Sequence, residues 1–166
     1  LRIRDALHER AMICLRGQHL TPAQQVAFTR RLGPLQPYAP GGAFRLPDAP
    51  DVQLISNIYE NGAPIGIIEA GQYWHTDASY SRTPPAYACL FAVQVPHDEK
   101  GEPLGGTIFA STAYAYDTLS PAQKQRIEGL RALHSRDHRK FSKARTSHKN
   151  EYDAPGQELD QPIVRV

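Results

Sequence analysis

Short runs of β-forming residues, each closed by residues that favour turns, occupy the middle of this 166-residue chain. Valine, isoleucine, tyrosine and threonine suit the pleated surface of a sheet, and Gly, Pro and Asn commonly end such runs. Several short strands with a few helices beside them predict a mainly β fold with flanking helices, either a β-sandwich or a jelly roll. The expected strands are Val52–Ile58, Tyr73–Tyr80, Ala86–Val95 and Thr107–Ala110, and the expected turns are Asn61-Gly62, Pro84-Pro85 and Gly105-Gly106.

Helices are expected on both sides of these runs. The sequence Thr-Pro-Ala-Gln at 21–24 places a cap residue, a proline at the first helical position and a glutamine three residues after the cap, with Gly33 as the stop. Ser-Pro-Ala-Gln at 120–123 has the same start signal, which is local chemistry and no evidence of a repeat. The opening residues Leu1–Arg10 have helical apolar spacing and lead into Ala11–Leu15, which suits a buried strand.

Length and charge limit the class of protein. The length fits a single domain, 1–166. The 19 basic and 17 acidic residues are scattered, unlike the basic stripe that nucleic-acid binding requires. No apolar run approaches the roughly 20 residues that span a bilayer, and no signal-peptide pattern is present. We therefore expect a cytoplasmic protein with a small-molecule partner and neither a nucleic-acid nor a membrane partner.

The cysteines and the chain ends give two further expectations. Cys14 and Cys89 each lie in an apolar run, far apart in sequence, so we expect buried free thiols and a reducing compartment. The missing initiator methionine and the β-like run Ile163–Val166 at the end predict a domain that is incomplete at both ends.

The sharpest chemical feature is the sequence Trp-His-Thr-Asp at 74–77. Residues i and i+2 of an extended strand project to the same face, so His75 and Asp77 could hold one metal ion together. An imidazole and a carboxylate suit divalent iron, and a two-His, one-carboxylate site leaves open positions for cosubstrate and O2. The triplet alone is weak evidence, because any surface histidine can lie two residues from an aspartate.

The surrounding sequence makes this motif more specific. In order and spacing, the chain resembles the taurine dioxygenase family of Fe(II)/2-oxoglutarate-dependent dioxygenases over nearly its whole length. This resemblance implies a double-stranded β-helix, or jelly-roll, core. It also implies an oxidoreductase that uses Fe(II), 2-oxoglutarate and O2 to hydroxylate a small, anionic organic acid, with succinate and CO2 as co-products. The segments that carry it are Leu15–Gln18, Gly71–Tyr80, Thr83–Pro85, Gly105–Ala110 and Ala115–Ser120.

The resemblance assigns roles to three residues. His75 and Asp77 match the first two iron ligands of the family, and Thr107 matches the threonine that hydrogen-bonds the cosubstrate carboxylate. Without the resemblance, Thr107 would be read as an ordinary β-branched strand residue after a glycine turn.

The remaining family ligands have no match within the chain. The distal iron-binding histidine and the arginine that binds 2-oxoglutarate are expected beyond Val166. His134, His138 and His148 lie in or beside a polar stretch and are read as surface histidines. That stretch, Arg136–Gln161, has no periodicity and fits either a lid over the site or a plain surface loop.

The substrate is less well defined by the sequence. Gly71 stands where the family can carry a substrate-binding asparagine, which argues against taurine itself. Asn57, Gln72 and Tyr73 are candidates to line the substrate pocket, and each fits a structural role equally well. The resemblance is also compatible with a homo-oligomer.

Two alternatives stay open at this stage. A jelly-roll binding protein could keep the fold without a competent iron site, and the presence of a downstream histidine and arginine would argue against it. A different mononuclear metal enzyme on a cupin-like barrel, for example a hydrolase, would work without 2-oxoglutarate.

Overall fold

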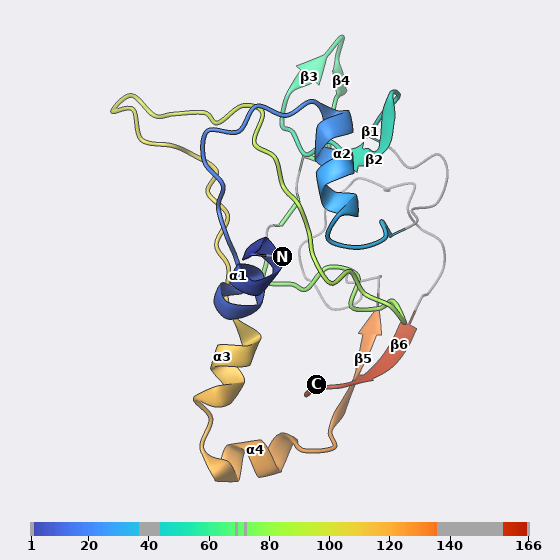
Figure 1. Cartoon of the computed structure of the whole chain (residues 1–166), viewed down its shortest axis with the longest axis vertical. Coiled ribbons are helices and arrows are strands. Elements are labelled where there is room, and N and C mark those ends of the chain that lie inside the picture. The colour runs from blue at the N-terminus through green and yellow to red at the C-terminus, as the bar shows by residue number, and fades with distance from the viewer. Residues whose placement is uncertain (1, 37–43, 69, 72, 136–157, 166) are drawn as a thin grey trace.

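Within the described residues, two helices precede the first four short strands along the chain, and two more helices precede the last two strands. Figure 1 shows the computed structural model, which describes all residues except 1, 37–43, 69, 72, 136–157 and 166. The strands pair as three two-stranded antiparallel sheets, β1–β2, β3–β4 and β5–β6. In chain order the elements are α1 Arg2–Arg10, α2 Pro22–Arg30, β1 Arg45–Leu46, β2 Ala49–Gln53, β3 Tyr59–Glu60, β4 Ala63–Pro64, α3 Thr112–Asp117, α4 Pro121–Ile127, β5 Arg131–Ser135 and β6 Glu158–Pro162.

Capping boxes start α2 and α4, as the sequence predicts. In α2 the hydroxyl of Thr21 accepts from the backbone N–H of Gln24 at 3.2 Å, and the Gln24 side chain accepts from the Thr21 N–H at 2.8 Å. In α4 the same pair of bonds joins Ser120 and Gln123 at 3.3 and 2.9 Å. Each box satisfies two N–H groups that a helix start leaves without a partner.

The first helix is also confirmed, and side-chain contacts attach it to distant residues. Arg4 donates to the carbonyl of Leu32 at 2.9 Å, just beyond the end of α2. His8 lies 2.6 Å from the hydroxyl of Tyr87, with the two rings stacked. The short helix α3 was missed from sequence; Ser111 caps it by accepting from the N–H of Tyr114.

The turn at Asn61-Gly62 is confirmed as the loop of the β3–β4 hairpin. Tyr59 pairs with Pro64 and Glu60 with Ala63, which leaves two residues to reverse the chain. Both have positive φ, 50° for Asn61 and 79° for Gly62, as a type I′ turn requires.

The longest ladder joins β5 to β6 across five residue pairs, from Arg131 opposite Pro162 to Ser135 opposite Glu158. Arg131 also binds the carboxylate of Asp160 at 2.7 Å across the two strands. The predicted polar loop Arg136–Gln161 is therefore wrong for its last residues, 158–161, because these belong to β6. Its other residues, 136–157, lie outside the described part of the chain. The expected run Ile163–Val166 is wrong as well, because the described part of it is a bend and not a strand.

Most of the other expected strands are wrong within the described residues. Only 52 and 53 of Val52–Ile58 belong to a strand, β2, with one isolated bridge from Ile55 to Ile67. A strand needs a partner from elsewhere in the chain, which local composition does not supply. The described residues accordingly form separate two-stranded sheets and show no jelly roll. Irregular backbone replaces the strands expected at Ala11–Leu15, Tyr73–Tyr80, Ala86–Val95 and Thr107–Ala110.

Few side chains of the described residues are deeply buried. Ala49 is 7% exposed and Gln161 is 6% exposed, whereas Val93 and Ile108 are largely in solvent. The two cysteines are free, as expected, but the prediction of burial is wrong, since Cys14 is exposed and Cys89 only half-buried. Within the described ranges, no helix has the length and apolar character needed to cross a membrane.

Removal of a helix cap provides a test of this local architecture. We expect Ser120→Ala to lower the free energy of unfolding by about 1 kcal/mol, because it leaves the N–H of Gln123 without its acceptor. Ser120→Asp keeps a capping oxygen and should lose much less. Urea unfolding followed by circular dichroism measures both variants, and an equal loss in the two would contradict the assigned cap.

Candidate functional site

His75 and Asp77 lie side by side, although the backbone that carries them is not a strand. Nε2 of His75 is 3.2 Å from Oδ1 of Asp77. The segment 73–76 is irregular, and a turn begins at Asp77, so the expected alternation of a strand does not explain the contact. The side chains are 44% and 63% exposed, which leaves the pair open to a ligand from solvent.

A hydrogen bond to the backbone fixes the orientation of the His75 ring. Nδ1 lies 2.8 Å from the carbonyl oxygen of Tyr73. Because a carbonyl only accepts, Nδ1 must carry a proton and donate it. In the neutral ring the lone pair then lies on Nε2, the nitrogen that faces Asp77. Metal-binding histidines commonly hold their second nitrogen in this way.

The donor set fits a divalent metal ion such as Fe(II). Two neighbouring ligands that each lie about 2.1 Å from a metal at a right angle are about 3 Å apart, close to the separation of Nε2 and Oδ1. An imidazole nitrogen and a carboxylate oxygen are also ligands that non-haem iron accepts. No group of three or more His, Cys, Asp or Glu side chains that could hold a metal occurs among the described residues, and the His75/Asp77 pair would supply two of the ligands.

Two left-handed backbone positions shape the loop around these ligands. Gly71 has φ 76°, and a Cβ at that position would lie 3.9 Å from Cε1 of His75. Ala78, directly after Asp77, has φ 48°, a conformation that an alanine rarely adopts. The N–H of Ser81 donates to the carbonyl of Ala78 at 2.8 Å and closes the turn that follows.

The other candidate residues are distributed unevenly around this pair. Tyr73 joins it directly, since its carbonyl accepts from His75 and its ring meets the imidazole edge-on at 6.0 Å. Thr107 and Asn57 are both exposed, and no hydrogen bond or ion pair of the described residues joins either of them to His75 or Asp77.

The remaining candidates are a glutamine and three histidines. Gln72, His138 and His148 lie outside the described residues. His134 is half-buried in β5, opposite Leu159, so its reading as a surface histidine holds only in part.

One residue of this region was missed from sequence. The side-chain amide of Gln161, in β6, donates to the carbonyls of Ser79 and Ser81 in the turn after Asp77. A glutamine more than eighty residues from the motif carries no local signal of such a contact.

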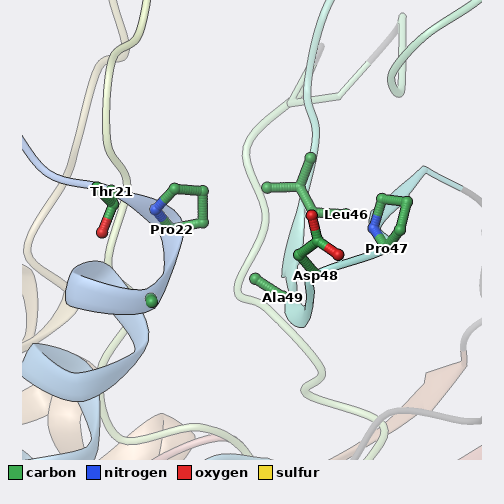
Figure 2. A pocket seen from close by; sticks show the side chains of 7 residues that line it. Thr21, Pro22, Leu46, Pro47, Asp48 and Ala49 are labelled. Atoms are coloured by element: carbon green, nitrogen blue, oxygen red, sulfur yellow. The ribbon is translucent and has the colours of Figure 1, made fainter.

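A pocket elsewhere in the molecule lies apart from the candidate residues. It lies between the start of α2 and the β1–β2 turn, has a volume of about 270 Å³, and is shown in Figure 2. Its polar groups include the Thr21 hydroxyl, which already accepts the capping bond of α2, and the Asp48 carboxylate. Its lining is otherwise apolar and contains no expected ligand.

Comparison with known proteins decides the family. The model of the family "Taurine catabolism dioxygenase TauD, TfdA family" matches residues 1–166. The chain belongs to this dioxygenase family. Fe(II) and 2-oxoglutarate are the cofactor and cosubstrate of TauD/TfdA dioxygenases, as the sequence led us to expect.

The relatives of this TauD/TfdA chain include enzymes whose names give different substrates or products. The alpha-ketoglutarate-dependent 2,4-dichlorophenoxyacetate dioxygenase of Cupriavidus pinatubonensis is 30% identical over 99% of this chain and 58% of its own length. Pentalenolactone F synthase of Streptomyces arenae is 33% identical over 79% of this chain and 43% of its own. The (S)-phenoxypropionate/alpha-ketoglutarate-dioxygenase of Sphingobium herbicidovorans is 31% identical over 81% and 44%.

The chain spans little more than half the length of the dichlorophenoxyacetate dioxygenases that it matches. No solved structure matches it.

Loss of either ligand should weaken metal binding. We expect His75→Ala and Asp77→Ala each to raise the dissociation constant for Fe(II) at least about 100-fold, because each removes a ligand and even outer-shell changes reach that size. Competition with a coloured chelator under argon measures it. His19→Ala, which removes an exposed histidine elsewhere, is the matched control and should bind like the wild type. Equal affinity in His75→Ala and the control would contradict the site.

Proposed function

We propose that this chain carries the His75/Asp77 part of the iron site of a 2-oxoglutarate-dependent dioxygenase that hydroxylates a small, anionic organic acid. The observation that supports this most is the 3.2 Å separation of Nε2 and Oδ1, with Nδ1 of the same ring engaged by the Tyr73 carbonyl. Family membership over residues 1–166 supports the reaction class. Succinate and CO2 would be the co-products.

The residues of the chain would bind and orient the reacting groups. His75 would bind the metal through Nε2 and Asp77 through Oδ1, while the Tyr73 carbonyl keeps the imidazole from turning. When bound, Fe(II) with 2-oxoglutarate and O2 supplies the oxidising chemistry that converts a C–H bond to an alcohol. Selectivity then depends on which C–H bond the protein holds close to the metal.

Thr107 would act on the cosubstrate. Its hydroxyl can donate a hydrogen bond to a carboxylate of 2-oxoglutarate, and its exposure leaves the hydroxyl available. The distal iron-binding histidine and the arginine that binds 2-oxoglutarate, which the family resemblance implies, would complete the site.

The substrate class follows from the names of the relatives and from the site itself. Phenoxyacetate and phenoxypropionate are small carboxylic acids, so we infer a small organic acid here too. Tyr73 would line the pocket, and the edge-on contact of its ring with the His75 imidazole supports this assignment. Asn57 and Gln72 remain proposed pocket residues on the resemblance alone.

Paired substrates test the proposal. With Fe(II), 2-oxoglutarate and O2, we expect a phenoxyacetate-type acid to stimulate succinate formation by the intact protein at least about tenfold more than its neutral amide. One lost charge-assisted hydrogen bond is worth about 1.5 kcal/mol or more, which corresponds to that factor. Succinate is measured by chromatography.

The controls test the assigned metal ligand and the proposed substrate class separately. Asp77→Ala should form no succinate with either compound, and succinate formation unaffected by this change would refute the assigned ligand. Stimulation only by neutral or cationic compounds would refute the anionic substrate. Tight binding of the acids without any succinate would favour a jelly-roll binding protein.

A further inference from the structure

Gln161 is the one buried polar side chain among the described residues, and it faces the loop that carries the iron ligands. It is 6% exposed. Its Nε2 donates to the carbonyl of Ser79 and, at 3.2 Å, to that of Ser81. An amide nitrogen has two hydrogens, so these two bonds use its whole donor capacity.

The strand that carries Gln161 is well anchored. Gln161 pairs with Ala132 in the five-pair β5–β6 ladder, the longest of the described sheets. The neighbouring residue, Asp160, is held across the ladder by Arg131. The bonds from Gln161 to the carbonyls of Ser79 and Ser81 hold the loop against this pair of strands. Gln161 therefore joins the loop to the β5–β6 sheet, which has the longest ladder among the described residues.

The turn that receives these bonds is half-buried, and local bonds also hold it: the Ser81 hydroxyl donates to the carbonyl of Thr83 and accepts from its N–H, both at 3.3 Å. It begins directly after Asp77 with Ala78 in the left-handed region, at φ 48°. Such a conformation in an alanine persists when surrounding contacts impose it. The bond from the Ser81 N–H to the Ala78 carbonyl is local, whereas the bonds from Gln161 come from a residue 80 and 82 positions away.

We propose that Gln161 is a positioning residue of the iron site, which holds the 78–81 turn so that the Asp77 carboxylate faces Nε2 of His75. This rests on the proposed function, because it assumes that His75 and Asp77 bind iron. Gln161 itself does not touch the metal. Its effect passes through the turn to the direction of one ligand.

Three variants distinguish the effect of losing the two N–H donors of Gln161 from the effect of changing the size of its side chain. Gln161→Met keeps the length of the side chain and loses both N–H donors. Gln161→Asn keeps the amide but is one methylene shorter and cannot reach both carbonyls. Gln125→Met changes an exposed glutamine of α4 and is the matched control.

The first readout is the dissociation constant for Fe(II), measured under argon on the intact protein without 2-oxoglutarate. We expect a 10- to 100-fold increase for Gln161→Met, the range for lost outer-shell support, a smaller increase for Gln161→Asn, and no change for Gln125→Met. Should Gln161→Met fail to fold, Gln161→Asn against Gln125→Met gives the same comparison.

The second readout needs no metal. Amide hydrogen exchange at the Ser81 N–H should become at least about tenfold faster in Gln161→Met, because the turn opens more often. Exchange at the Thr118 N–H, which bonds to the carbonyl of Tyr114, and along β5 should stay as in the wild type. A purely structural loss would instead raise exchange at all of these amides.

The outcomes distinguish the two proposals. If Gln161→Met binds Fe(II) as tightly as the wild type, while His75→Ala does not, the positioning role is refuted and the proposed function stands. If the wild type binds Fe(II) no better than His75→Ala, the proposed function is refuted. The proposal that Gln161 positions an iron ligand is then refuted as well. Ser81 exchange then decides separately whether Gln161 holds the turn, and an unchanged rate refutes that as well.

Discussion

The bond from Nδ1 of His75 to the carbonyl of Tyr73 is the contact on which the site depends. It decides which ring nitrogen carries the proton and which one faces Asp77. Without it, an exposed imidazole could turn about its side-chain bonds, and the approach to the carboxylate would be lost on average. A single backbone carbonyl thus orients the pair of side chains that we propose as metal ligands.

The sequence predicted the features whose causes are local. The capping boxes at Thr21 and Ser120 were correct because cap, proline and glutamine lie within four residues of one another. The Asn61-Gly62 turn was correct for the same reason, since its conformation depends on those two residues. The HxD motif was found because its two proposed ligands are only two positions apart, although the strand expected beneath it is absent.

The features that were missed depend on residues far apart in sequence. Strand pairing brings Arg131–Ser135 to Glu158–Pro162, and composition gave a polar loop where β6 lies. Gln161 had no recognisable role until its two carbonyl partners were seen 80 and 82 positions away. The jelly roll expected from the resemblance also requires distant pairing, and the described residues form three separate two-stranded sheets instead. Thr107 stays a prediction from the motif.

The central claim is that His75 and Asp77 hold the iron to which 2-oxoglutarate binds. The most direct measurement is the visible spectrum of the intact protein under argon as 2-oxoglutarate is added in the presence of Fe(II). We expect a charge-transfer band from the chelated cosubstrate in the wild type and its loss in His75→Ala. A wild-type protein that folds and shows no band, or a band that His75→Ala leaves unchanged, would contradict the account.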